Sequence, residues 1–117
     1  MSANFSVTKG TLKRAYSRND TADFVATSPN VAAGVPTIGF AAHEALIMQD
    51  VAAAGWARFE NLDTTNYVEI GTDVAAAFVP FLKISPGEYQ FVKLATNAPY
   101  AKANTAAVKL DYEIFQA

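Results

Sequence analysis

The chain has 117 residues, of which 51% are hydrophobic and 17% are charged, and its formal net charge is −2. This length fits one domain, and the mixture of nine basic and eleven acidic residues lacks the positive excess of proteins that bind nucleic acid directly. The absence of cysteine excludes disulfides and thiolate metal sites.

The N-terminal segment, residues 1–20, is polar and weakly patterned. It carries four basic residues among isolated apolar ones: Lys9, Lys13, Arg14 and Arg18. Such a segment lacks the apolar stretch of a secretory signal peptide, and it predicts an arm or a first strand ahead of a domain over residues 21–117. No stretch approaches the roughly 20 apolar residues that a membrane-spanning helix needs, so we expect no membrane partner.

Between residues 5 and 48 the pattern is irregular, with turn-forming residues between short apolar runs. Strands are expected at four places: residues 5–16, 24–27, 35–40 and 45–48. Residues 43–50 have some helix propensity. An isolated helix of that length is marginal in water and the neighbouring pattern is β-like, so a strand is preferred there.

The next segment contains two strand-like runs joined by a polar turn. Residues 55–62 and 67–71 flank an Asp-Thr-Thr-Asn turn at 63–66, whose side chains compete for nearby backbone groups. These runs predict a hairpin. The small residues that follow, 74–77, fit either a bulged loop or a single helical turn.

Two further runs are rich in aromatic and β-branched residues. Residues 78–84 and 89–94 flank a Ser-Pro-Gly-Glu turn at 85–88, and they predict another hairpin. Pro80 cannot donate a ladder hydrogen bond, so it is confined to an edge strand or a bulge. Full pairing of this strand is expected only after Phe81.

The C-terminal run has the clearest pattern. Apolar and charged residues alternate through 108–114, which is the period of a strand with one buried face. Ahead of it, residues 99–103 predict a short extended piece, and Asn104 and Thr105 predict a hairpin or a tight corner.

These elements predict one all-β domain. Seven to nine short strands with turn signals between them, and no long amphipathic helix, favour an antiparallel β-sandwich of jelly-roll-like form. Trp56 is expected either in the core or at an interface. The residues expected in the core alternate along their strands: Phe59, Val68, Ile70, Leu82, Phe91, Leu110 and Tyr112.

The chain offers little catalytic chemistry. His43 is the single histidine, so a metal site would lack the second nitrogen ligand of most zinc centres, and no serine lies in a nucleophile elbow. A hydrolase or cupin-like enzyme is therefore disfavoured, and His43 is expected to be structural. Two carboxylate pairs, Glu60 with Asp63 and Glu69 with Asp73, lie at strand ends and in turns, where acids usually cap backbone groups. A calcium site would use Asp63, Asn66, Glu69 and Asp73, but their spacing is not that of an EF-hand. We expect no catalytic residue, metal ligand or cofactor.

Binding at an exposed surface is the remaining possibility. Aromatic side chains anchor protein interfaces and stack on sugars, although cross-strand packing is the commoner role of each one. Five residues are candidates for an interface: Trp56, Asn61, Asp63, Asn66 and Tyr67.

Three phrases in the second half of the chain carry a resemblance. They are GWARFENLDTTNYVEIG at 55–71, LKISPGE at 82–88 and YAKANTAAVKLDYEI at 100–114. In this order and spacing they resemble a small β-sandwich virion protein of tailed bacteriophages and prophages, over residues 55–114. No catalytic or binding residue is carried over from that group.

The resemblance implies a virion structural protein, assembled in the cytoplasm of a bacterial host. The leading hypothesis is a homo-oligomeric capsid decoration protein, also called an auxiliary or cement protein, which binds the major capsid protein. Residues 1–20 would then be an arm that orders on neighbouring subunits. The alternatives are a neck, tail or fibre-attachment component, and a carbohydrate-binding β-sandwich module. In the virion roles the partners are further copies of the chain and other virion proteins, without direct nucleic-acid contact.

Overall fold

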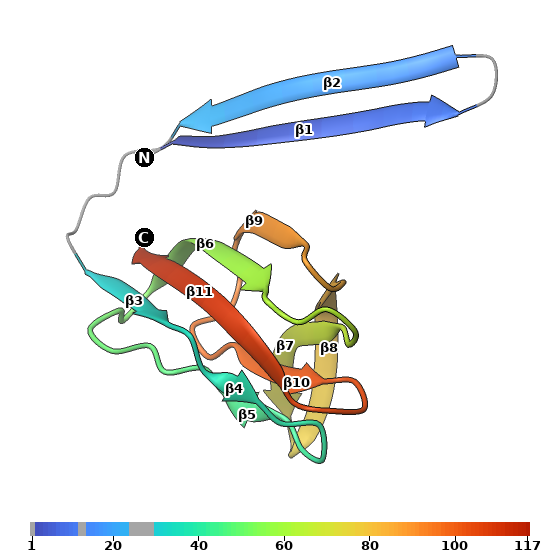
Figure 1. The fold of residues 1–117 in the computed structure, drawn as a ribbon. Helices are drawn as coiled ribbons and strands as arrows, with labels where there is room; N and C mark the ends of the chain where they lie inside the picture. The colour runs from blue at the N-terminus through green and yellow to red at the C-terminus, as the bar shows by residue number, and fades with distance from the viewer. Residues whose placement is uncertain (1, 12–13, 24–29) are drawn as a thin grey trace.

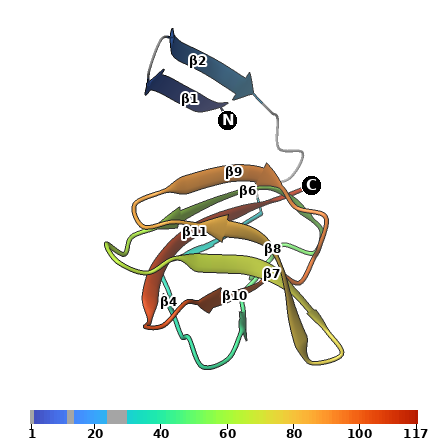
Figure 2. The same cartoon turned by 90° about the vertical axis from the view of Figure 1, so that its right-hand side faces the viewer.

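The structure is a computed structural model that describes residues 2–11, 14–23 and 30–117. In these residues the regular structure consists of β-strands, which form an N-terminal hairpin and two larger antiparallel sheets (Figure 1). Figure 2 shows the two sheets as stacked layers, with β9, β6 and β11 in one layer and β8, β7 and β10 in the other. The expected all-β sandwich is confirmed.

The hairpin consists of β1 (Ser2–Thr11) and β2 (Arg14–Asp23), which pair with each other and with no strand of the sandwich. The single strand expected over 5–16 is therefore wrong, because its described residues belong to two antiparallel strands. The strand expected at 24–27 lies outside the described residues. The role of residues 1–20 as an arm stays a prediction.

Each layer of the sandwich is one sheet. The first sheet follows the order β3 (Val31–Gly34), β11 (Val108–Gln116), β6 (Ala54–Asn61) and β9 (Tyr89–Lys93), and β4 (Thr37–Ile38) also pairs with β11. The second follows the order β5 (Glu44–Ala45), β10 (Tyr100–Ala103), β7 (Val68–Val74) and β8 (Ala77–Ile84). The strands expected at 35–40 and 45–48 are present only as the short pieces β4 and β5.

Strands β3 and β4 form one edge strand in two pieces. Gly34 faces Tyr112 and Ile38 faces Val108, so both pieces share one register against β11. Between them lies Pro36, which has no N–H to donate, although its carbonyl oxygen accepts a hydrogen bond from the Leu110 amide at 3.0 Å. An edge position tolerates such a residue because one side of the strand has no ladder to complete.

The strand order is that of a jelly roll. With β3 and β4 counted as one, the sandwich has eight strands, and they pair first with last, second with seventh, third with sixth and fourth with fifth. This is a long hairpin rolled into two sheets, the double-sheet arrangement that closes a β-sandwich. The chain consequently passes from one sheet to the other at most of its turns.

Two expected hairpins are wrong for this reason. Strands β6 and β7 lie in different sheets, and so do β8 and β9. The turn chemistry itself is present, since Gly87 has a φ of 73° and the Glu88 amide donates to the Ser85 carbonyl oxygen at 3.0 Å. Turn residues mark where the chain reverses, but they do not determine the strand with which the next run pairs. The turn between β10 and β11 is the expected corner.

Within the sandwich, β7 and β8 are the consecutive strands that do pair. Val74 faces Ala77 across a two-residue turn, in which Ala75 and Ala76 have φ values of 53° and 69°. Positive φ at both central residues is the mirror-image turn whose twist suits a hairpin. The bulged loop and the helical turn expected over 74–77 are therefore both wrong.

Strand β8 contains a bulge next to its proline. Ile70 faces Leu82 and Gly71 faces Pro80, so Phe81 is the extra residue on an edge strand, as Pro80 requires. Pairing continues beyond the bulge to Ala77. The expectation that pairing would be complete only after Phe81 is therefore wrong.

The core lies between the sheets, where alternate residues of each strand point inward. Of the seven expected core residues, Leu82 is partly buried against the core and the other six are buried. Phe91 differs from the rest. It faces Arg58 on the outer side of the first sheet, where its ring stacks on Trp56 with centroids 5.1 Å apart.

Candidate functional site

The five interface candidates from the sequence do not form one site. Asn61 is fully buried at the end of β6. Its amide nitrogen donates to the carbonyl oxygens of Asn66 and Ile84 at 2.9 and 3.0 Å, and its amide oxygen accepts from the Asp63 amide at 2.8 Å. These bonds hold two crossing turns together, so this side chain is not available to a partner.

Asp63 and Asn66 organise the same end of the sandwich. The Asp63 carboxylate accepts backbone hydrogen bonds from Asn66 at 2.6 Å and from Thr65 at 3.0 Å. These two bonds, that from Asn66 first, lower the pKa of Asp63 below its ordinary value. The Asn66 side-chain oxygen accepts from the Thr105 hydroxyl at 2.9 Å, which joins this turn to the corner before β11.

Tyr67 and Trp56 lie apart from each other. The Lys83 ammonium sits 4.2 Å from the centre of the Tyr67 ring, a cation–π contact between the turn and β8. Trp56 lies on the outer face of β6, five residues before Asn61 and on the opposite face of the strand. The structure therefore brings Asn61, Asp63, Asn66 and Tyr67 to one end of the sandwich. The interface role of Asp63, Asn66 and Tyr67, which are partly exposed, stays a prediction.

The outer face of the first sheet carries a charge cluster that the sequence did not single out. Arg58 contacts Glu60 at 2.9 Å, Asp111 at 3.1 Å and Glu113 at 3.3 Å, and each of these carboxylate side chains is about one-third exposed. Burial alone would lower the pKa of Arg58, but the bond to Glu60 and the charges of Asp111 and Glu113 raise it overall. We call these four residues the acidic face.

The acidic face could be predicted from the sequence only if the pairing of β6 with β11 were already known. Arg58 and Glu113 face each other across β6 and β11, as do Glu60 and Asp111. In the sequence these residues are separated by about half the chain. Three carboxylates around one guanidinium leave a formal charge of −2 on this patch of the sheet.

His43 has a definite partner. Its Nε2 lies 2.7 Å from the Asp73 carboxylate, and its ring packs 5.4 Å from that of Phe78 and 5.3 Å from that of Tyr100. The bond to His43, together with a backbone bond from Ala76, lowers the pKa of Asp73. This pair joins the corner before β5 to the tip of the β7–β8 hairpin.

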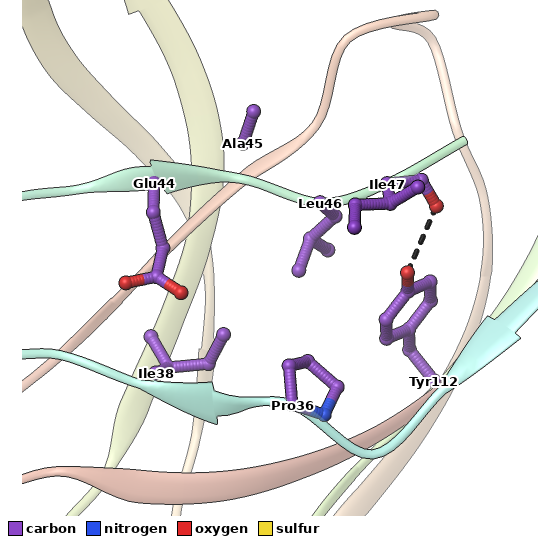
Figure 3. Close-up of a pocket in the computed structure, with 7 residues that line it drawn as sticks. All are labelled: Pro36, Ile38, Glu44, Ala45, Leu46, Ile47 and Tyr112. Atoms are coloured by element: carbon purple, nitrogen blue, oxygen red, sulfur yellow. Dashed lines mark hydrogen bonds between the residues drawn. The ribbon is translucent and has the colours of Figure 1, made fainter. Parts of the chain in front are cut away.

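A small pocket opens between β4 and β5, at one side of the sandwich (Figure 3). Its volume is about 100 Å³, well below the roughly 300 Å³ at which small-molecule sites begin. Pro36, Ile38 and Leu46 give it apolar walls, and the Tyr112 hydroxyl closes one end by donating to the Ile47 carbonyl oxygen at 2.8 Å. The pocket has room for one side chain and not for a cofactor.

The edge formed by β8 is apolar and exposed. Val74, Val79 and Phe81 are each about half exposed, and no residue from Val74 to Leu82 is charged. We call this segment the β8 edge. Beside Phe81 lies a shallow groove of about 360 Å³, whose other walls are Thr72, Lys93, Ala95 and Thr96. An open edge strand with apolar side chains is a surface that pairs readily with other chains.

No protein-family model, curated protein or solved structure matches this chain. The described residues contain no group of three or more acidic and histidine side chains that could hold a metal ion. They also form no helix with the length and apolar character needed to cross a membrane.

Proposed function

We propose that this chain is a structural protein of a bacteriophage particle, a homo-oligomeric decoration protein that binds the major capsid protein. The observation that carries the proposal is the β8 edge. Its unpaired backbone groups and exposed apolar side chains suit attachment to another protein surface. The resemblance of residues 55–114 to phage virion proteins supports the same role, and the jelly roll is a fold that viral capsid proteins use.

A structural role also agrees with the way polar groups are used. His43 bonds to Asp73 and packs against the rings of Phe78 and Tyr100. The side-chain amide of Asn61 forms hydrogen bonds with three backbone groups. Both arrangements stabilise turns and corners. We therefore propose that the protein is not an enzyme.

The test is performed on purified phage particles. Copy number is counted by quantitative mass spectrometry, and capsid stability is measured as the temperature at which the particles release their DNA. We expect a copy number close to that of the major capsid protein and a lower release temperature in particles without this chain. Absence from purified particles would contradict the proposal.

The same particles test the β8 edge. Val79→Lys and Phe81→Lys place a charge on the edge, and both should reduce the copy number because burying an unpaired ammonium is costly. Ile47→Lys is the matched control, since Ile47 is 70% exposed and lies away from β8. Equal occupancy of all three variants would show that the β8 edge is not the contact.

A neck, tail or fibre-attachment component is the alternative within the virion. It would use the same edge with a different partner, and only a few copies would be present in each particle. Copy number therefore separates this role from capsid decoration.

A carbohydrate-binding module is the second candidate, because lectins also use jelly rolls and Trp56 lies on an outer sheet face. The Trp56 ring stacks against Phe91 at an interplanar angle of 11°, so at most one face of the indole can contact a sugar. A glycan array with the wild type and with Trp56→Ala tests this. Glycan binding that Trp56→Ala removes would favour the module over the decoration protein.

A further inference from the structure

The open side of β8 carries a short stretch of backbone without a strand beside it. Val74 and Ala77 close a two-residue hairpin turn, and the closing pair of such a turn is hydrogen-bonded, so the Ala77 amide points toward β7. Backbone groups alternate between the two sides of an antiparallel strand. The groups of Val79 therefore also point toward β7. Those of Phe78 and Pro80 point to the side on which β8 has no neighbour in its sheet (Figure 1).

The pairing of β7 with its other neighbour agrees with this assignment. Gly71 lies opposite Tyr100 of β10 and opposite Pro80 of β8. The backbone N–H and carbonyl oxygen of one residue point to the same side of a strand, so Gly71 bonds to only one of these two neighbours. Proline has no N–H with which to complete a bonded pair. Gly71 consequently bonds toward Tyr100, and Pro80 faces the open side.

Two side chains of the chain itself cap the ends of this stretch. At the turn, the Asp73 carboxylate accepts from the Ala76 amide at 3.0 Å. At the other end, the side-chain amide of Gln90, on β9, donates to the Lys83 carbonyl oxygen at 2.9 Å. These bonds satisfy the backbone on either side and leave the stretch between them for a partner.

Three backbone groups form what we call the β8 window: the Phe78 N–H and the carbonyl oxygens of Phe78 and Pro80. In the described part of the chain none of them has a hydrogen-bond partner. The window thus contains one donor and two acceptors. A partner that buries these groups must bond to them, because an unpaired buried backbone group costs free energy. An extended chain supplies the two N–H groups and the carbonyl oxygen that are needed.

A second β8 window is a poor partner for the first. Two windows with one donor and two acceptors each contain two donors and four acceptors, so two carbonyl oxygens stay unpaired in every register. Pro80 is thus an example of the edge prolines that keep copies of a sheet from pairing with each other. An extended segment of a different kind, with an N–H on each residue, pairs all three groups.

The side chains next to the window favour an apolar residue in the partner. Val79 and Thr72 are paired across the two strands, so their side chains lie on the same face of the hairpin. Val79 is about half exposed, and Thr72 lines the groove beside Phe81. A partner residue opposite Val79 lies on this same face, next to the groove. An apolar side chain there covers exposed apolar surface.

We propose that the β8 window binds a short extended segment of another protein as an added antiparallel strand, with an apolar residue opposite Val79. Three backbone hydrogen bonds hold the segment, one from the Phe78 N–H and two to the carbonyl oxygens. Antiparallel pairing continues the arrangement of the sheet and is the more stable kind per residue. The inference deepens the proposed function, and the identity of the partner as the capsid protein rests on that function.

The first experiment measures amide hydrogen exchange in the free chain by NMR. The Val79 amide is bonded to β7 and the Phe78 amide is open, so the Phe78 amide should exchange at least tenfold faster after correction for sequence. Equal protection of the two amides would overturn the proposal, because the Phe78 N–H would then already have a partner.

The second experiment measures binding of purified variants to particles that lack this chain. Phe78→Pro and Phe78→Ala both remove the aromatic ring, but only proline also removes the open N–H. Phe78→Pro should bind at least tenfold more weakly than Phe78→Ala, because a carbonyl oxygen of the partner is left buried without a donor. Equal affinities would overturn the proposal. Thermal unfolding checks that both variants fold, and if Phe78→Pro is unfolded, the third experiment decides.

The third experiment adds a donor to the window. Pro80→Ala gives each window two donors and two acceptors, so two copies can then pair fully. Sedimentation equilibrium should show self-association at least tenfold tighter than that of the wild type. Pro36→Ala is the matched control, because the Pro36 carbonyl oxygen bonds to the Leu110 amide and the added N–H points into the sheet. No gain with Pro80→Ala, or an equal gain with Pro36→Ala, would overturn the proposal.

A failed decoration role and a failed β8 window give different results. If the wild type does not bind the particles, the decoration role fails, and the gain expected for Pro80→Ala still decides whether the window pairs with strands. If the wild type binds and the two folded Phe78 variants bind equally well, the decoration role stands and the window is not its contact.

Discussion

Gly71 lies so close to Val79 that a Cβ atom on this glycine would be 2.3 Å from the Val79 carbonyl oxygen. The atoms nearest to that Cβ position belong to the backbone of β8, next to the bulge at Phe81. Backbone, and not a flexible side chain, would therefore have to move. Gly71→Ala should destabilise the fold by about 3 kcal/mol, as overpacking of a rigid site does. Gly39→Ala is the control, because its nearest atom is the flexible Glu44 carboxylate at 3.6 Å. Urea unfolding measures both, and equal stabilities would show that the bulge relaxes freely.

The turn between β7 and β8 is built from residues that do not favour its conformation. Ala75 and Ala76 both have positive φ, which costs a residue with a Cβ about 1–2 kcal/mol. Ala75→Asn combined with Ala76→Gly should therefore stabilise the protein by about 1–2 kcal/mol, because Asn-Gly is preferred in this turn. The Asp73 carboxylate keeps its bond to the backbone amide of residue 76.

The control for this turn is Ala107→Gly. Ala107 is exposed in a loop and has no positive φ, so glycine should give no gain there and cost up to about 1 kcal/mol. Thermal unfolding of the two variants gives the comparison. A melting temperature raised by Ala107→Gly as much as by the turn variant would show that relief of strain is not the cause.

The sequence predicted the strands more successfully than their partners. Alternation through 108–114 marked β11, and Pro80 marked an edge and a bulge, because both signals depend only on local backbone chemistry. The pairing of β6 with β9 depends on how the whole chain folds into two sheets, and the polar turns at 63–66 and 85–88 have the same chemistry whether they join strands of one sheet or of two. The two-residue turn at Ala75 was missed because its sequence lacks the glycine or asparagine that usually reveals it.

The surface residues show the same difference between local features, which the sequence predicted, and long-range contacts, which it did not. Asp63 was identifiable as a turn former, and its side chain does cap two backbone amides. The acidic face was not predictable, because Arg58 and Glu113 meet only through the register of β6 against β11. Asn61 was a candidate interface residue, whereas in the structure two crossing turns bury it.

Asn61 should be among the most sensitive polar residues of the chain. Its removal would leave the buried Ile84 carbonyl oxygen without the hydrogen bond that the Asn61 side chain donates to it. The Asp63 backbone amide would also lose its hydrogen bond to the Asn61 side-chain oxygen. Because an unsatisfied buried group costs about 1–3 kcal/mol, Asn61→Ala should lower the free energy of unfolding by roughly 2–4 kcal/mol. Asn104→Ala is the matched control, since Asn104 is exposed and its backbone amide makes the contact with Tyr67. Urea unfolding with similar midpoints for both variants would contradict a structural role for Asn61.

Acid should weaken the fold through Asp63 and Asp73. Both carboxyl groups have pKa values lowered from 3.8, Asp63 chiefly by the backbone bond from Asn66 and Asp73 chiefly by the bond from His43. A lowered folded pKa means that the stabilisation is complete above the unfolded value and is lost as the pH falls through the folded one. The free energy of unfolding should therefore fall as the pH drops below about 4, and Asp63→Asn or Asp73→Asn should each make that fall shallower. Chemical unfolding at a series of pH values gives the slopes, and a wild-type slope in both the Asp63 and Asp73 variants would show that these two carboxylates do not link the fold to pH.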